Sequence, residues 1–379
     1  MRVAIFGAGY AGLGLARRLE RTLSPDDDLL VVDESRFHVV RHLLHRAIRH
    51  PDAMDHLEIP LADLLDRAES RTARVTDVDP DAGQATLEDG KTLPFDVGAV
   101  TLGTEPEYYG MDGIEEYAET LNRSGDAAAI RSAFLTAVDA DGRIVIGGGG
   151  LTGIQIAGEL AALADDHAVA DRVEITLLEQ ADAVPPGHDE RLQRAVTDAL
   201  TDAGVTVRTG VRITSVEDGA IVVADDDPIP YEQFVWAGGV RGDGALGGER
   251  PTVPATLRLG GDTFALGDAA QVIDTDGQAV PATAQAAIRQ VPVAATNVGR
   301  LLDRKRSGRT GFDPRLRRYR YEELGWMVSV GDDAIARVGP NVLTGTAAVG
   351  VKTAVGAGYL SSIGLVGDAV EHVRKTYGN

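Results

Sequence analysis

The sequence predicts an α/β protein built on two Rossmann-like dinucleotide-binding units. Three observations support this fold class. A G-x-G-x-x-G turn at residues 7–12 follows an apolar strand and leads into a helix, and the same pattern recurs at residues 148–153. In each copy a second apolar strand follows and ends in an acid, Asp33 in the first copy and Glu179 in the second. Because the whole pattern occurs twice in one chain, we prefer two nucleotide sites to a structural fold with incidental glycines.

The glycines and the acids each have a physical role in this pattern. The first glycine permits a tight turn, the second lets the backbone approach a pyrophosphate, and the third lets the helix pack on the strand. The phosphates then bind the unpaired N–H groups at the start of the helix. The acid accepts hydrogen bonds from a ribose. Glu179 favours NADH over NADPH, because a 2′-phosphate would meet a like charge there.

The composition is strongly acidic and contains no cysteine. The 379 residues carry a formal charge of −21 and only four lysines. Such a surface repels nucleic acid and anionic membranes and is typical of proteins from salt-loving (halophilic) archaea, so we expect stability to depend on salt. The absence of cysteine excludes a disulfide scaffold, a cysteine-ligated metal and a redox-active cysteine pair. With no signal peptide before the first strand and no run of eighteen apolar residues, we expect a cytoplasmic location.

The segments between and after the two fingerprints complete the predicted sheets. The strand at 97–103 is expected to return to the first sheet, and Glu88–Gly90 is the turn of a hairpin. Residues 59–65 are expected to form a short helix. Further on, a strand at 262–266 ends in Gly267 and Asp268, and a helix starts at Thr283.

Five of the eight histidines lie between His38 and His56. If this stretch were one helix, His38, His42 and His45 would share a face at a spacing that suits a metal. We favour the alternative, polar residues on a segment packed near the cofactor, and expect no metal site.

Together these segments resemble the flavoproteins with two dinucleotide-binding domains, and among them the type II NADH dehydrogenases, the NADH:quinone oxidoreductases that do not pump protons. The resemblance spans residues 1–360 and is carried by residues 7–12 (GAGYAG), 109–121 (YGMDGIEEYAETL), 148–160 (GGGLTGIQIAGEL), 235–241 (VWAGGVR), 264–269 (FALGDA) and 281–287 (PATAQAA).

The resemblance implies a glutathione-reductase-like FAD/NAD(P) fold. In that fold the NAD(H)-binding domain, residues 113–245, is inserted in a discontinuous FAD-binding domain, residues 1–112 and 246–311. A small C-terminal region, residues 312–379, completes the chain.

It further implies FAD on the first fingerprint and NADH on the second. Gly7, Gly9 and Gly12 would hold the FAD pyrophosphate, Asp33 the adenosine ribose and Asp268 the ribityl chain. Gly148, Gly150, Gly153 and Glu179 would hold NADH. The other implied cofactor-binding positions are Ala11, Glu34, Gly103, Thr152, Gly238, Gly267 and the helix start Thr283, Ala284 and Gln285.

Three residues are the candidates for catalysis. The helix that begins at Gln285 would point its positive N-terminus at the flavin. Lys352 would face the flavin ring, or would be a solvated surface lysine. Gln155 stands where the family commonly has Glu, and it cannot carry a proton. In the family's quinone motif A-Q-x-A-x-Q, Arg289 replaces the second Gln and Gln290 follows it.

The resemblance implies that NADH reduces the flavin, which then passes two electrons to an acceptor, most simply a quinone. Two alternatives stay open: a reductase of a small electron-carrier protein, like a rubredoxin or ferredoxin reductase, and a flavin-based NADH sensor with little turnover. The family's C-terminal membrane helices look absent, so we expect at most weak peripheral contact with the inner face of the membrane. Whether a second copy of the chain is a partner, in a homodimer, also stays open.

Overall fold

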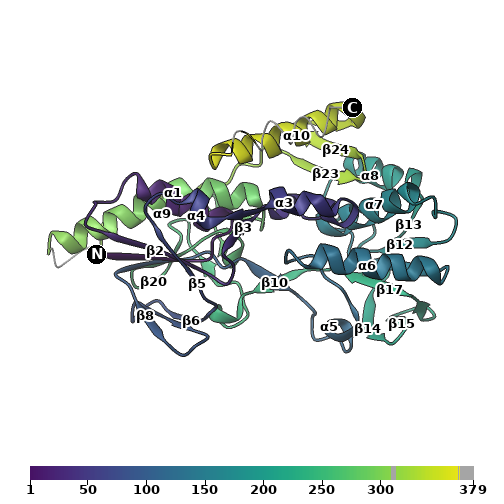
Figure 1. Ribbon diagram of the computed structural model, residues 1–379. Helices are drawn as coiled ribbons and strands as arrows, with labels where there is room; N and C mark the ends of the chain where they lie inside the picture. Colours follow the sequence, from purple (N-terminus) through teal and green to yellow (C-terminus); the bar gives the residue numbers. More distant parts are fainter. Residues whose placement is uncertain (309–312, 366, 368–379) are drawn as a thin grey trace. The chain divides into compact units, whose positions relative to one another are not determined.

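The computed structural model describes residues 1–308, 313–365 and 367, and the chain folds into two compact units (Figure 1). The first unit contains Met1–Val39, Glu58–Glu105 and Val240–Glu322. The second unit contains Val40–Leu57, Pro106–Gly239 and the C-terminal segment that begins at Glu323. Each sequence fingerprint lies in a unit of its own, which agrees with the predicted fold of two dinucleotide-binding domains.

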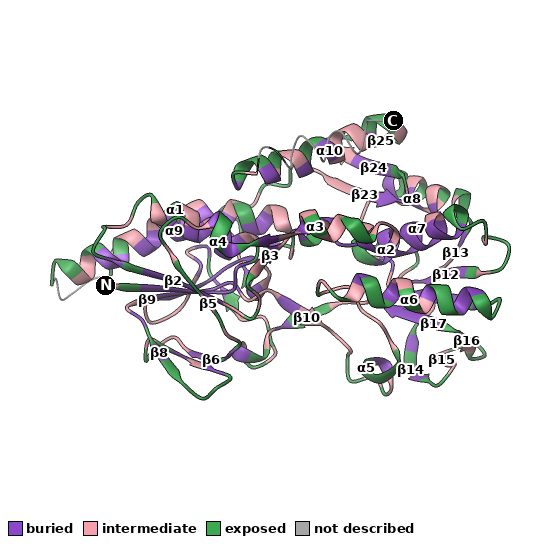
Figure 2. Cartoon of the chain, viewed as in Figure 1, coloured by how far each residue is buried: buried purple, intermediate pink, exposed green. Residues whose placement is uncertain are grey.

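The first unit is organised around a six-stranded sheet. Its strand order is β20 (Arg258–Gly260), β21 (Thr263–Ala265), β9 (Val97–Val100), β1 (Arg2–Phe6), β2 (Asp28–Asp33) and β5 (Glu69–Thr72). All neighbouring strands are parallel except β20 and β21. The pairing of β9 with β1 confirms the expected return of this strand to the first sheet. The central strands are apolar on both faces, as a parallel sheet covered by helices requires (Figure 2).

Two long helices of the first unit, α1 (Tyr10–Glu20) and α9 (Ala284–Arg306), pack against each other. Gly14 allows this approach, because a Cβ there would lie 3.1 Å from Val291. Short elements complete the unit: β3 (Phe37–Val39), β4 (Glu58–Pro60), α4 (Leu61–Leu64), β6 (Val75–Asp79), β7 (Gln84–Leu87), β8 (Thr92–Pro94), β10 (Thr104–Pro106), β18 (Val240–Gly242), η3 (Gly244–Leu246), β19 (Thr252–Val253), η4 (Gly267–Ala269) and β22 (Gln271–Val272). The antiparallel pairing of β7 with β8 confirms the predicted hairpin.

The second unit repeats the βαβ arrangement on a smaller scale. Its parallel sheet has the order β13 (Val205–Arg208), β12 (Glu174–Leu178), β11 (Arg143–Gly147) and β17 (Gln233–Trp236). Helix α7 (Leu151–Asp166) follows β11, and α6 (Asp126–Asp139), α8 (Glu190–Asp202), α5 (Ile114–Tyr117), β14 (Ile213–Glu217), β15 (Ala220–Val223) and β16 (Ile229–Pro230) surround the sheet. Helix α7 is buried along most of its length, so it is the central helix of this unit.

The C-terminal segment belongs to the second unit. It forms an antiparallel sheet of β23 (Trp326–Val330), β24 (Asp333–Val338) and β25 (Asn341–Thr344), followed by α10 (Gly345–Ser362). A Cβ at Gly158 in α7 would lie 2.6 Å from the Cα atom of Val330, so this glycine lets β23 pack directly on α7. The described part of this C-terminal segment therefore packs with the second unit. Its last part, 366 and 368–379, lies outside the described residues.

A second difference from the expected domain bounds concerns the histidine-rich stretch. Residues 40–57 leave the first unit and form η1 (Arg41–Leu43), α2 (Arg46–Arg49), η2 (Pro51–Ala53) and α3 (Met54–Leu57). Helix α2 packs on α6 and α7, because Ala47 and Ile48 are buried in the apolar core of the second unit. The stretch is not one helix, so the three histidines at metal spacing do not share a face.

Two absences hold within the residues that the structure describes. No helix there has both the length and the apolar character needed to cross a membrane. The same residues contain no group of three or more histidines, aspartates and glutamates arranged to hold a metal ion.

Candidate functional site: two glycine cradles and a buried polar cluster

The glycine turn of the first unit has the backbone shape that its spacing predicts. Gly7 has φ +102°, which side chains rarely adopt, and its Cβ would clash with the Thr101 carbonyl at 2.3 Å. A Cβ at Gly12 would lie 1.8 Å from the Gly7 carbonyl oxygen, so only glycine lets α1 begin so close to the strand. A Cβ at Gly9 meets nothing within 4 Å. The turn is therefore closed toward the protein and open at its middle glycine.

The acid at the end of β2 fixes this turn. Asp33 accepts hydrogen bonds from the backbone N–H of Ala8 at 2.6 Å and of Ser35 at 2.8 Å. His38 binds the same turn from the other side, with Nδ1 2.8 Å from the carbonyl oxygen of Ala8. Because a carbonyl only accepts, this ring nitrogen carries the proton. The first histidine of the rich stretch is thus a buried structural partner of the turn.

The second unit contains the same turn. Gly148 has φ +110°, and a Cβ at Gly153 would lie 1.9 Å from the Gly148 carbonyl oxygen. Glu179 accepts from the backbone N–H of Gly149 at 2.7 Å and of Ala181 at 2.8 Å. A Cβ at Gly150 meets nothing within 4 Å. The glycine contacts and the two backbone hydrogen bonds to the acid recur here, so the two fingerprints form two equivalent cradles.

The structure brings the other predicted residues of the first unit to its cradle. Gly267 lies against α1 and α9, because a Cβ there would be 3.0 Å from Ala11 and 3.4 Å from Ala287. Helix α9 begins directly after Thr283, whose hydroxyl accepts from the Ala286 N–H at 3.2 Å. The turn that carries Asp268 and the start of the helix that carries Gln285 therefore meet at the glycine turn.

Two residues that the sequence analysis did not single out hold the Asp268 turn. Gln290 is 1% exposed, and its Oε1 accepts from the N–H of Gly267 at 2.7 Å. Arg250 donates to the carbonyl oxygens of Asp268 at 2.7 Å and Ala270 at 2.9 Å. Gln290 was visible only as a displaced glutamine of the family motif. Nothing in the sequence connects Arg250 to the turn.

In the second unit, the end of β17 closes the cradle. A Cβ at Gly148 would lie 2.6 Å from the carbonyl oxygen of Ala237, and a Cβ at Gly238 would overlap the Trp236 ring. Thr152 is exposed in the first turn of α7. The remaining predicted positions belong to the first unit: Gly103 adopts φ +81° after β9, and Glu34 is exposed after Asp33.

Two of the three candidate catalytic residues meet in a buried polar cluster of the second unit. We use the name His45 cluster for His45, Gln155, Glu159, Ser329 and Lys352. The Nε2 atom of His45 is its centre. It lies 3.0 Å from the Ser329 hydroxyl, 3.3 Å from the Lys352 amine, 3.4 Å from the Gln155 amide nitrogen and 3.8 Å from a Glu159 oxygen.

Hydrogen-bond chemistry fixes the charge state of the histidine. The amide nitrogen of Gln155 only donates, so Nε2 of His45 accepts and the ring is neutral. Burial, followed by the nearby positive charge of Lys352, holds the pKa of His45 well below its usual range. Lys352 is not the solvated surface lysine of the alternative reading, because its amine also donates to Ser329 and burial lowers its pKa to about 7.

Glu159 was not singled out from the sequence either. It is 3% exposed on α7, one turn after Gln155, and burial raises its pKa to about 7. Its position, one helical turn after the place where the family commonly has Glu, could have signalled a buried acid on this helix. Only the fold shows that His45 and Lys352 face it.

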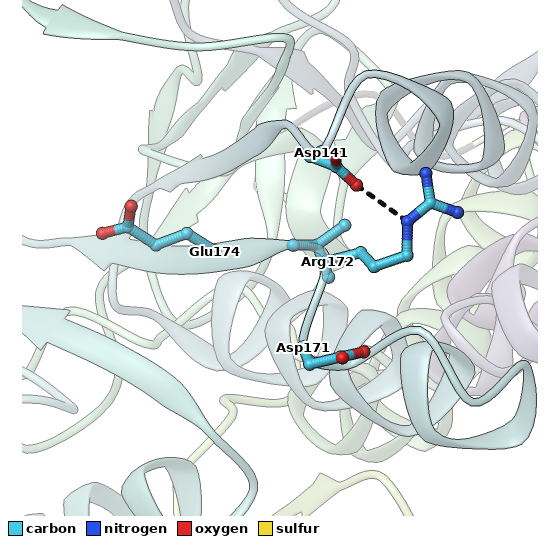
Figure 3. A pocket seen from close by; sticks show the side chains of 5 residues that line it. Asp141, Asp171, Arg172 and Glu174 are labelled. Atoms are coloured by element: carbon cyan, nitrogen blue, oxygen red, sulfur yellow. Dashed lines mark hydrogen bonds and ion pairs between the residues drawn. The ribbon is translucent and has the colours of Figure 1, made fainter.

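A surface pocket of the second unit lies elsewhere. Asp141, Asp171, Arg172, Val173 and Glu174 line it, and Arg172 is paired with Asp141 at 2.7 Å (Figure 3). These residues stand at the amino ends of β11 and β12, whereas the glycine cradle follows the carboxyl end of β11. Dinucleotides bind at the carboxyl ends of such strands, so this pocket is not the nucleotide site.

Comparison with known proteins agrees with this geometry. The sequence profile described as pyridine nucleotide-disulphide oxidoreductase matches residues 1–291. Among curated proteins, the type II NADH:quinone oxidoreductase of Staphylococcus haemolyticus is 27% identical over 398 residues, covering 97% of this chain and 96% of that protein. The protein of the same name from Staphylococcus saprophyticus is 29% identical over 334 residues, covering 80% of this chain and 83% of its own length.

Solved structures share the whole fold. NDH2 from Plasmodium falciparum, solved in complex with NADH, superposes with a TM-score of 0.85 at 12% identity, covering 100% of this chain and 98% of that one. The sulfide:quinone oxidoreductase of Aquifex aeolicus has a TM-score of 0.78 at 18% identity, covering 100% and 95%. The arrangement of two dinucleotide-binding domains in one chain is therefore confirmed.

Proposed function

Because the chain belongs to the pyridine nucleotide-disulphide oxidoreductase family, we propose that it is an FAD-dependent NADH:quinone oxidoreductase. The net reaction is NADH + H⁺ + quinone → NAD⁺ + quinol. The curated relatives that cover nearly its full length carry this activity in their names. The observation that carries the proposal is the pair of equivalent glycine cradles, since this reaction needs one site for a flavin dinucleotide and one for NADH.

The first cradle fits the pyrophosphate of FAD. Gly9 leaves open space where any other residue would carry a side chain, and Gly7 and Gly12 bring the first N–H groups of α1 to that space. Asp33 holds the turn in shape and would accept the adenosine ribose. Asp268, on a turn held by Gln290 and Arg250, would bind the ribityl chain. When bound, FAD supplies the redox chemistry, accepting a hydride from NADH and donating two electrons to the acceptor.

The start of α9 adds an electrostatic contribution. This helix has 23 residues, and Thr283 caps its first turn while Gln285 is its second residue. The N-terminus of a helix carries roughly half a positive charge, which favours a negative charge nearby. When FAD is bound, Gln285 and its neighbours at this helix start would favour a negative charge on the flavin.

The second cradle would bind NADH. The N–H groups at the start of α7 would hold the pyrophosphate, with Gly148, Gly150 and Gly153 giving access. Glu179 would accept the adenosine ribose and reject a 2′-phosphate. Gln155 would not transfer a proton, because an amide does not titrate, so it serves as a hydrogen-bond partner of His45.

The absence of cysteine and the names of the relatives together favour quinone as the electron acceptor. The sequence has no cysteine, so the disulfide chemistry in the family's name is excluded. At the second glutamine of the quinone motif, Arg289 pairs with the Glu322 carboxylate at 3.2 Å. We propose that quinone binds near this position despite the ion pair between Arg289 and Glu322.

The acidic surface favours a cytoplasmic protein with only weak membrane contact. A homodimer is testable by light scattering.

The test is anaerobic stopped flow on the purified holoenzyme. NADH is expected to bleach the flavin absorbance, and ubiquinone-1 or menadione is expected to restore it rapidly. Reoxidation only by a small electron-carrier protein would support the reductase alternative, and a long-lived reduced complex without turnover would support the sensor. Protein that contains no flavin and takes up none would contradict the proposal.

A further inference from the structure

The His45 cluster gathers polar side chains from four distant parts of the chain. His45 precedes α2, Gln155 and Glu159 lie on α7, Ser329 on β23 and Lys352 on α10. His45 is 2% exposed, Glu159 3%, Ser329 5% and Gln155 7%, and Lys352 is partly buried. Burying so many polar groups together costs free energy unless they satisfy each other. His45, Gln155, Ser329 and Lys352 do so through hydrogen bonds, whereas Glu159 only approaches His45 at 3.8 Å. None of the steps proposed above uses Glu159 or Lys352.

The cluster holds an acid and a base that can exchange a proton. Glu159 and Lys352 can be ionised together or neutral together, and the net charge of the pair is zero in both cases. His45 lies next to both, with Nε2 3.8 Å from Glu159 and 3.3 Å from Lys352. A proton added from solvent would leave the pair with one positive charge. A charge placed near the cluster therefore changes how strongly the pair of Glu159 and Lys352 binds this extra proton.

The second cradle and the cluster share one helix. The glycine turn opens α7, Gln155 lies half a turn after Gly153, and Glu159 follows one turn later. At 1.5 Å per residue, Glu159 is about 9 Å along the helix axis from Gly153. Gln155 connects the two regions, because its amide donates to His45 at 3.4 Å.

We propose that Glu159 and Lys352, linked through His45, form a buried proton-binding site that takes up a proton when an anionic dinucleotide occupies the cradle of α7. The inference rests on the proposed NADH site. Two negative phosphates at the start of this helix favour the protonated pair, and we expect them to raise its proton affinity about tenfold. Reciprocity then requires that protonation tighten dinucleotide binding by the same factor.

Other charged groups also face the cluster. Arg46 and Arg49 come from α2, His42 from the turn before it, and Asp332 from the turn between β23 and β24. Arg49 is paired with Asp166 and Asp332 at 2.6 and 2.8 Å, so its charge is compensated. The pKa of Glu159 and of Lys352, both brought to about 7 by burial, puts the exchange near neutral pH.

The test uses the oxidised holoenzyme and ADP-ribose, which carries the pyrophosphate but cannot reduce the flavin. Isothermal titration calorimetry in phosphate and in Tris buffer at pH 7.5 measures the protons taken up on binding. We expect about half a proton per ADP-ribose and a dissociation constant that falls about eightfold from pH 9 to pH 6. NAD⁺ is the second probe for the same site.

Variants locate the proton. The double variant Glu159→Gln, Lys352→Met keeps the net charge and is expected to lose the uptake and the pH dependence. The matched control, Glu174→Gln with Lys91→Met, changes the same residue types at exposed positions and should keep both. If the double variant does not fold, the single variant Glu159→Gln is expected to lose at least half of the uptake.

The outcomes separate the two proposals. ADP-ribose binding without proton uptake in the wild type, or equal uptake in wild type and double variant, overturns the proton site and leaves the NADH site intact. No binding of ADP-ribose or NAD⁺ overturns both. Uptake that disappears only in the cluster variants supports the inference.

Discussion

The side-chain oxygen of Gln290 accepts a hydrogen bond from the backbone N–H of Gly267 at 2.7 Å. This contact ties helix α9, whose N-terminus is assigned to the flavin, to the turn that carries Asp268. Asp268 and Gln285 are 17 positions apart in the sequence. The buried hydrogen bond of Gln290 holds the turn and the helix next to each other in space.

Replacing Gln290 by Leu should therefore weaken flavin binding. It leaves a buried N–H without a partner, which costs about 1–3 kcal/mol, and it frees the Asp268 turn. We expect the FAD dissociation constant to rise about tenfold or more, measured by fluorescence after deflavination and reconstitution. Gln193→Leu, on α8 of the other unit, is the control and should bind FAD like the wild type. Unchanged FAD affinity in the Gln290 variant would show that the turn needs no such support.

Glycine substitutions should separate the two cradles. In Gly153→Ala the new methyl group would lie 1.9 Å from the Gly148 carbonyl, so the turn must open. We expect normal FAD content and at least a tenfold rise in the dissociation constant for NAD⁺. Gly12→Ala, with a contact of 1.8 Å, should show the reverse, flavin loss with NAD⁺ binding kept. Gly299→Ala, where a Cβ meets nothing within 4 Å, is the control and should gain about 0.5–1 kcal/mol of stability.

Glu159 should make stability fall as pH rises. Burial raises the pKa of this carboxyl to about 7 from 4.5, so between these values the native state holds a proton that the unfolded chain has released. The unfolding free energy therefore decreases with rising pH across this window. Lys352 does not contribute there, since it is charged in both states below its own pKa of about 7.

Removing this carboxyl should remove that dependence. Relative to the wild type, Glu159→Gln is expected to gain roughly 2–3 kcal/mol between about pH 5 and pH 7, measured by urea denaturation at each pH. Glu174→Gln, at an exposed position, should differ from the wild type by a constant amount. Parallel curves for wild type and Glu159→Gln would mean that this acid is ionised throughout.

Salt should stabilise the protein. The net charge is −21, and acidic residues occur in runs such as Asp225–Asp227, so the folded chain repels itself at low ionic strength. Molar KCl shortens the Debye length to about 3 Å and should raise the melting temperature by about 5 °C or more, equal to about 2 kcal/mol. A melting temperature that is the same in dilute buffer and in molar KCl would contradict the expected adaptation to salt.

Local patterns were sufficient for both cradles. In each cradle the third glycine is needed because its Cβ would meet the carbonyl of the first glycine, a contact within one turn. Gly7 and Gly148 adopt nearly the same backbone angle, as the repeated spacing requires. The helix start after Thr283 was predictable for the same reason, because a cap involves only neighbouring residues.

The chain's sequence by itself thus determined the fold class, two nucleotide cradles in one polypeptide and the exclusion of cysteine chemistry. Only the tertiary structure decided that residues 40–57 and the C-terminal segment belong to the second unit, and that the Lys352 amine lies at His45. His45 and Lys352 are separated by 307 positions, and no spacing rule relates them. Polar groups can be buried only where partners from other segments meet them, so their neighbours are set by the packing of the whole unit.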